Sequence, residues 1–148
     1  MKIFISGTAG FGSGKTLREL PNDVKALIDT YIKDETEILV GDCIGVDLLV
    51  QKYLTAKNYK NVTVYHSGNA YRNLIDPDWK TYSAKVPYGV KGREFFAAKD
   101  KRMALDADAG LALWDGKSVG TGRNIANMRE MNKIVTVYRI DKNIFEEM

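Results

Sequence analysis

The sequence is poor in the residues that hold metals and cross-links. Among its 148 residues, Cys43 is the only cysteine and His66 the only histidine. A single cysteine excludes an intramolecular disulfide, and the two residues offer no Cys/His set for a zinc site. We therefore predict neither a metal site nor a bound cofactor.

Long apolar runs and clusters of one charge are absent as well. No apolar stretch could span a bilayer, and the run after Met1 is too short for a signal peptide. These absences predict a cytoplasmic protein with no membrane partner. The net charge is only +3 and no run of lysine or arginine stands out. On this ground the sequence predicts against nucleic acid as a partner.

Short apolar runs alternate with amphipathic stretches along most of the chain. Apolar residues spaced three and four apart predict helices, and short apolar or β-branched runs predict strands. Alternating strands and helices form parallel sheets with right-handed crossovers. We therefore predict an α/β fold: a single Rossmann-like domain over residues 1–148, with a mainly parallel five-stranded sheet and helices on both faces. The expected strands are 2–6, 37–40, 62–65, 109–113 and 134–138, and the expected helices begin near residues 22, 46, 92 and 122.

The segment 66–91 interrupts this alternation. It holds few aliphatic residues but contains Trp79, three tyrosines and two prolines. Loops of this length in compact domains are commonly functional, and the aromatic content predicts a packed loop or lid. In the helix that follows, Phe96, Met103 and Ala107 are predicted to point inward.

The stretch 106–124 predicts a phosphate-binding wall. A buried strand gives way to a turn rich in glycine and polar residues, and a helix is expected from about residue 122. Backbone N–H groups at a helix N-terminus are unpaired, and the helix dipole adds roughly half a positive charge there. Ligands of parallel sheets bind beyond the carboxyl ends of the strands. The loops after Gly7, Gly41 and His66 are therefore expected at the same edge.

The segment Ala9–Thr16, AGFGSGKT, fits a relaxed P-loop pattern. A P-loop needs its helix to start at the Gly-Lys-Thr, so that the amides cradle the phosphates. Pro21 follows too soon for such a helix. We therefore favour a loop whose Lys15 helps to hold an anion, and keep a P-loop NTPase that uses Lys15 and Thr16 as a weaker alternative.

The turn 41–47, GDCIGVD, follows the second expected strand. Gly41 and Gly45 permit a tight turn and the close approach of a ligand, while Asp47 falls in the first turn of the next helix. A negative charge there stabilises the helix dipole. The residues alone leave open whether Asp47 caps the helix or contacts a ligand.

Other side chains near these turns offer further contacts. Trp114 follows a strand end, where it either stacks on a base or caps the core. Arg72 and Arg93 flank the segment 66–91 and could clamp phosphates in bidentate fashion. Lys117 in the glycine-rich turn could meet a phosphate or only water.

Two stretches resemble the SLOG superfamily. GDCIGVDLLVQKYL is similar to its G-x-x-x-G-[IV]-D turn, and ADAGLALWDGKSVGTGRNI to a second signature in which an apolar strand leads to a Gly-x-Gly-Thr turn. The superfamily includes the bacterial DNA-processing protein A and the Lonely-guy cytokinin-activating enzymes. Small stand-alone members from bacteria and phages resemble the chain most, over roughly residues 2 to 138. The resemblance implies a Rossmann-like fold that binds nucleotides or nucleotide-derived ligands.

The resemblance also implies that a catalytic activity of the related enzymes is missing from this chain. Lonely-guy enzymes carry P-G-G-x-G-T-x-x-E, whose glutamate is catalytic, together with an arginine on the preceding helix. In this chain Asn124 holds the place of the glutamate, and the place of the arginine falls near Lys99. Because an amide cannot act as a general base, N-glycosidic cleavage is predicted to be lost unless Asp42, Asp47 or Asp115 substitutes.

These features together predict a protein that binds a nucleotide or nucleotide-derived small molecule, such as an ADP-ribose-type signal, as a sensor or by sequestering it. A hydrolase that cleaves an N-glycosidic or phosphate bond of a nucleotide is the alternative, with no catalytic residue assigned. A homo-oligomer is compatible with both. The expected ligand-binding residues are Gly7, Thr8, Lys15, Gly41, Asp42, Gly45, Asp47, Arg93, Trp114, Asp115, Gly116, Lys117, Ser118, Gly120, Thr121 and Asn124.

Overall fold

The computed structural model describes residues 1–9 and 18–146 of the chain. No helix in these two ranges is long and apolar enough to cross a membrane. The elements are β1 (Lys2–Gly7), α1 (Asn22–Lys33), β2 (Glu37–Gly41), α2 (Val46–Ala56), β3 (Val62–Ser67), β4 (Lys80–Ala84), α3 (Gly92–Asp106), β5 (Ala109–Trp114), α4 (Val119–Glu130), β6 (Ile134–Arg139) and β7 (Ile144–Phe145).

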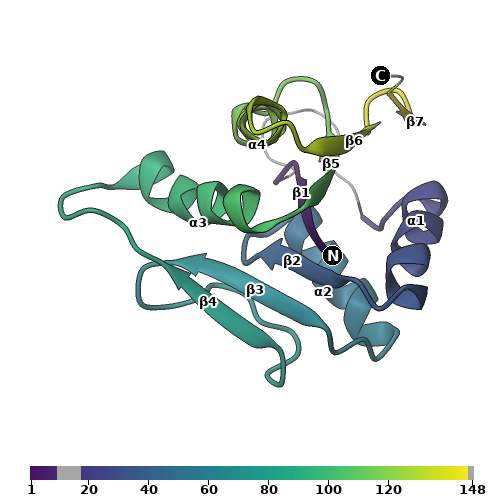
Figure 1. Cartoon of the computed structure of the whole chain (residues 1–148), viewed down its shortest axis with the longest axis horizontal. Helices are drawn as coiled ribbons and strands as arrows, with labels where there is room; N and C mark the ends of the chain where they lie inside the picture. Colours follow the sequence, from purple (N-terminus) through teal and green to yellow (C-terminus); the bar gives the residue numbers. More distant parts are fainter. Residues whose placement is uncertain (10–17, 147–148) are drawn as a thin grey trace.

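The described strands form one sheet in the order β4-β3-β2-β1-β5-β6-β7. The strands from β1 to β6 pair in parallel, and β7 pairs antiparallel with β6. The chain runs outward from β1 to β4 and then returns through α3 to β5, so the strand order reverses between β1 and β5 (Figure 1). The predicted fold class, a mainly parallel Rossmann-like sheet with helices on both faces, is confirmed.

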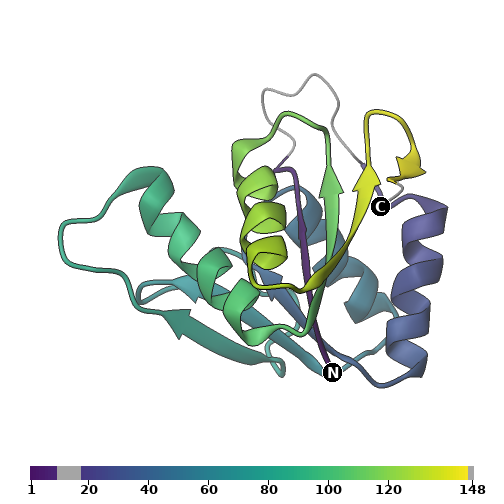
Figure 2. The same cartoon turned by 45° about the horizontal axis from the view of Figure 1, so that its top comes forward.

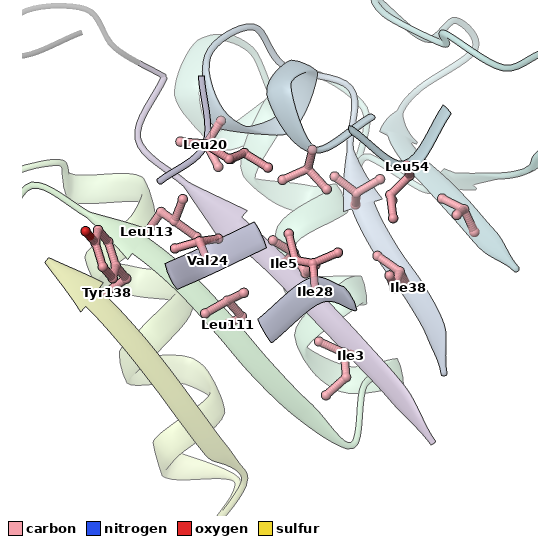
Figure 3. Packing of buried hydrophobic residues seen from close by; sticks show 14 of the residues in the cluster. Ile3, Ile5, Leu20, Val24, Ile28, Ile38, Leu54, Leu111, Leu113 and Tyr138 are labelled. Atoms are coloured by element: carbon pink, nitrogen blue, oxygen red, sulfur yellow. The ribbon is translucent and has the colours of Figure 1, made fainter. Parts of the chain in front are cut away.

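Two hydrophobic cores lie on the two faces of this sheet. On one face, Ile3 and Ile5 of β1 pack with Val24 and Ile28 of α1 (Figure 3), and α2 covers the same side. On the other face, Phe4 belongs to the core that α3 and α4 cover. Neighbouring residues of a strand point to opposite faces, so strands that are covered on both faces are apolar throughout. This is why apolar or β-branched runs marked the five strands in the sequence.

Two strands lie where the sequence predicts none. β4 falls inside the segment 66–91, and β7 lies in the C-terminal tail. In β4 only Ala84 is buried, because this strand is an outer one and the four residues before Ala84 are exposed. An exposed strand carries no apolar signal. Trp79, just before β4, is 3% exposed and donates from Nε1 to the carbonyl oxygen of Tyr59 at 2.9 Å, which anchors the segment to the sheet.

Two helices differ from their predictions. α4 begins at Val119 rather than near residue 122, so Gly120 lies in its first turn. Met103 in α3 and Ala107, its C-cap residue, are buried as predicted. Phe96 is 41% exposed, so its predicted inward position is wrong. The first turns of α3 extend away from the sheet (Figures 1 and 2). The helical spacing of apolar residues therefore continues into the first turns of α3, where no core lies beneath the helix to bury them.

Candidate functional site

A cavity of about 340 Å³ lies at the carboxyl edge of the sheet, where the strand order reverses. In Figure 2 the ends of β1 and β5 and the N-terminus of α4 lie together at the top. This is the position at which open parallel sheets bind ligands. The cavity is lined by Ser6, Gly7, Ala9, Cys43, Asp47, Arg72, Arg93, Phe96, Ala97, Lys99, Asp100, Lys101, Ser118, Val119, Gly120, Thr121, Arg123, Asn124 and Asn127.

The N-terminus of α4 presents backbone donors to this cavity. The amides of Val119, Gly120 and Thr121 have no hydrogen-bond partner among the described residues, as expected for the first turn of a helix. A Cβ built on Gly120 would meet nothing within 4 Å. Unpaired N–H groups and the positive end of the helix dipole together favour an anion.

The turn before α4 is held by its own side chains. Asp115 Oδ1 accepts the backbone N–H groups of Lys117 at 2.9 Å and Ser118 at 2.7 Å. Burial alone would raise the pKa of Asp115, but these amide donors outweigh it and hold the pKa below its ordinary value. Trp114 Nε1 donates to the carbonyl oxygen of Ser118 at 3.0 Å, and the guanidinium of Arg139 lies 5.4 Å from the Trp114 ring. These residues fix the turn and leave the helix amides free.

A buried charge cluster forms the floor of the cavity. Lys99 is 4% exposed and donates to Asp100 Oδ1 at 2.7 Å, and its Nζ lies 3.9 Å from Asp47 Oδ2. Asn124 Nδ2 donates to the other oxygen of Asp100 at 3.4 Å. Burial lowers the pKa of Lys99, but Asp100 and Asp47 outweigh it, so that the pKa is raised and the ammonium stays charged.

Asp47 is the member of this cluster whose charge is least well compensated. Burial raises its pKa from 3.8 to about 6, although Lys99 and the amide of Cys43 favour the ionised form. The Cys43 N–H donates to Asp47 Oδ2 at 3.2 Å, so Asp47 both closes the β2–α2 turn and faces the cavity. A Cβ on Gly41 would collide with Asp47 Oδ2, which explains the glycine at that position.

Arg72 and Phe96 form a stacked pair at the wall of the cavity. The guanidinium carbon of Arg72 lies 4.1 Å from the centroid of the Phe96 ring. Asp42 fixes the arginine from behind: its Oδ1 accepts Arg72 Nη2 at 2.9 Å and its Oδ2 accepts the Arg72 backbone N–H at 2.8 Å. Asp42 is 2% exposed, while the side chain of Arg72 is 37% exposed. The pair is therefore a platform that Asp42 holds in place and that is partly exposed to solvent.

Three more cations surround the platform. Lys101 and Arg123 lie 3.9 and 3.2 Å from Glu94, in pairs whose side chains are more than half exposed. Exposed pairs of this kind contribute little, so these cations remain available to another anion. Arg93 has no ion-pair partner in the described part of the chain. Among the described residues, five cations and two carboxylates line the cavity.

The structure brings some of the predicted site residues together and separates others. Lys15, with the rest of the P-loop pattern from 10 to 16, lies outside the described residues. Arg72 was considered in the sequence, whereas the exposed Phe96, Lys101 and Arg123 were missed, because helical periodicity alone does not show which face meets a ligand. The predicted residues that line the cavity are Gly7, Asp47, Arg93, Ser118, Gly120, Thr121 and Asn124, and those that do not are Thr8, Gly41, Asp42, Gly45, Trp114, Asp115, Gly116 and Lys117.

Comparison with known proteins identifies a structural neighbour. No family model matches the chain. No curated protein matches it either. A solved structure of DNA processing protein A from Helicobacter pylori, described for its unique single-stranded DNA binding mode, superimposes with a TM-score of 0.64 at 17% identity. The match covers 93% of this chain and 64% of that chain, so the present chain spans less than two thirds of the neighbour. The likeness shows a Rossmann-like fold.

The neighbour overturns two predictions made from the sequence. The ligand was expected to be a nucleotide or nucleotide-derived small molecule, with a nucleotide hydrolase and a P-loop NTPase as alternatives, and nucleic acid was predicted to be an unlikely partner. Both predictions are wrong, because a solved protein of similar fold, DNA processing protein A, is described by its binding of single-stranded DNA. The error has a physical origin: a net charge of +3 averages over the chain, whereas cations gather at one edge of the sheet.

Proposed function

We propose that this protein binds single-stranded DNA at the carboxyl edge of its sheet. The observation that carries this proposal is the Arg72–Phe96 platform, which lies beside the free amides of α4 and a group of exposed cations. Proteins that bind single strands combine a positive surface, which follows the backbone, with flat side chains on which bases stack. The Arg72–Phe96 platform, the free amides of α4 and the exposed cations all line one cavity here.

Each part has a distinct role in the proposed complex. A phosphate lies against the amides of Val119, Gly120 and Thr121, where the helix dipole favours it. Arg93, Arg123 and Lys101 neutralise neighbouring phosphates. A base of the strand stacks on the exposed surface of the Arg72–Phe96 pair, which accepts any base because every base has a flat face.

The neighbour and the sequence motifs also support a superfamily and a domain organisation for this chain. DNA processing protein A is among the proteins of the SLOG superfamily that the two glycine-rich stretches resemble, which supports placing this chain in that superfamily. The described strands form one continuous sheet, which supports treating residues 1–148 as a single domain.

Replacing Phe96 by alanine is expected to weaken binding of a single-stranded oligonucleotide by about 1–3 kcal/mol, the usual contribution of one base–aromatic stack. Phe96 is 41% exposed, so the substitution removes the platform with little disturbance of the core. Fluorescence anisotropy of a labelled oligonucleotide of about 12 nucleotides at low salt measures the change.

The matched control is Phe96→Trp, which keeps a flat ring and is expected to keep the affinity. Duplex DNA of the same sequence should bind more weakly than the single strand, since its bases are already stacked. Equal affinity of the wild type and Phe96→Ala for the single strand would remove the platform from the site. Failure of the wild type to bind any oligonucleotide would reject the proposed function.

A further inference from the structure

The loop between β4 and α3, residues 85–91, presents a single aromatic side chain to solvent. Tyr88 at its tip has a relative exposure of 107%. The loop lies at the far left of Figures 1 and 2, away from the sheet. A Cβ built on Gly89 or Gly92 would meet nothing within 4 Å. The exposure of Tyr88 shows that its ring is open to solvent, which is what a stacking partner needs.

The backbone of this tip is a fixed turn. The N–H of Val90 donates to the carbonyl oxygen of Pro87 at 3.2 Å, which closes a four-residue β-turn. Gly89, the third residue, has a φ of +85°, whereas Tyr88 is not among the residues with positive φ. A positive φ at the third position alone defines a type II turn, which favours glycine there. The turn thus sets the direction of Tyr88 before any partner arrives.

The charge around the tip has one sign. From residue 79 to residue 93 the chain carries Lys80, Lys85, Lys91 and Arg93, and no aspartate or glutamate. Lysines that flank an exposed ring attract a polyanion, and they disfavour the close approach of a second copy of the same loop. An isolated aromatic amid cations is the combination found on surfaces that bind single strands.

The loop is continuous with the proposed binding cavity. Arg93, which follows the loop directly, lines that cavity. Arg93 is five positions after Tyr88 in the sequence, a reach of at most about 18 Å along the chain. A strand that leaves the cavity past Arg93 can therefore meet the tip within a few nucleotides.

We propose that Tyr88 is a second stacking site for single-stranded DNA, outside the cavity, with Lys85 and Lys91 as its phosphate contacts. The proposal rests on the function proposed above and adds to it: the protein holds one part of the strand in the cavity and a second part at the loop. The loop then determines how long a strand must be for full affinity.

Strand length separates the two sites experimentally. With an oligonucleotide of about 12 nucleotides, Tyr88→Ala is expected to raise the Kd by about 5- to 150-fold, as the loss of one base stack does. With a dinucleotide, which fills only the cavity, the same substitution should leave the Kd unchanged. Tyr88→Trp should restore the affinity, and its emission should be quenched when the longer strand binds. Ile144→Ala, which removes an exposed apolar side chain on the outer strand β7, is the matched control and should change neither Kd.

The salt dependence distinguishes stacking from charge. Lys91→Gln should reduce the slope of log K against log salt by about 0.7, the value for one phosphate contact of a single strand. Tyr88→Ala should lower the affinity and leave that slope unchanged. A changed slope in Tyr88→Ala would overturn the stacking role.

The outcomes also separate this inference from the proposed function. If the wild type binds the longer strand and Phe96→Ala weakens it but Tyr88→Ala does not, only the second site is overturned. If the wild type binds no strand, both proposals fail. If sedimentation shows a wild-type dimer that Tyr88→Ala dissociates, with the oligonucleotide Kd unchanged, the tip contacts protein and the inference is overturned.

Discussion

Replacing Lys99 by methionine is expected to lower the free energy of unfolding at pH 7 by about 3–5 kcal/mol, as the loss of one partner of a buried ion pair does. Lys99 is 4% exposed, with Asp100 at 2.7 Å and Asp47 at 3.9 Å. Methionine retains the length of the apolar stem and removes only the ammonium. The two carboxylates would then lie close together without a compensating cation. Urea unfolding followed by circular dichroism measures the loss.

Lys101→Met is the matched control on the same helix. The Lys101 side chain is 65% exposed and lies 3.9 Å from Glu94, so its removal should change stability by no more than about 0.5 kcal/mol. Burial raises the pKa of Asp47 to about 6 against the opposing effect of Lys99, so in Lys99→Met that pKa is higher and Asp47 takes up its proton at a higher pH. The deficit of Lys99→Met should therefore shrink as the pH falls from 8 toward 6. A Lys99→Met variant as stable as the wild type at pH 7 would show that the cluster is not held by this charge.

The sheet could be predicted from the sequence because buried strands have a recognisable local composition. β1, β2, β3, β5 and β6 contribute residues to the cores on both faces, and each contains a short apolar or β-branched run. β4 has no such composition, since all its residues except Ala84 are exposed. The position of the cavity followed from topology alone, because ligands bind where the strand order of a parallel sheet reverses.

The contents of the cavity were harder to predict, since they depend on contacts between distant residues. Asp42 was taken as a ligand contact, but it holds Arg72, thirty residues away in the sequence. Asp47 and Lys99 meet across an even longer separation. Phe96 shares the helical spacing of Met103, yet one is exposed and the other buried. No periodicity distinguishes the two, because only the extent of the sheet beneath α3 decides which of them has a core.

Replacing Asp47 by asparagine is expected to remove a pH dependence from the stability of the fold. Burial raises the pKa of Asp47 from 3.8 to about 6. The folded state therefore binds this proton more tightly than the unfolded state, and the resulting stabilisation is fully present below pH 3.8 and is lost as the pH rises through 6. A difference of this size corresponds to about 3 kcal/mol. Asparagine carries no charge at any pH and keeps an oxygen that can accept the N–H of Cys43.

The measurement is urea unfolding of the wild type and Asp47→Asn from pH 4 to pH 7 at constant ionic strength. The difference in unfolding free energy should shift by about 3 kcal/mol in favour of Asp47→Asn as the pH rises. Asp78→Asn, which replaces a carboxylate whose side chain is 81% exposed, is the control and should show a constant difference.

The same proton also affects the binding site, since the cavity loses a negative charge below pH 6. Single-stranded DNA should therefore bind the wild type more tightly at pH 5 than at pH 7, once the change in Asp47→Asn has been subtracted. A wild type and an Asp47→Asn variant with parallel pH profiles of both stability and affinity would show that Asp47 does not titrate in this range.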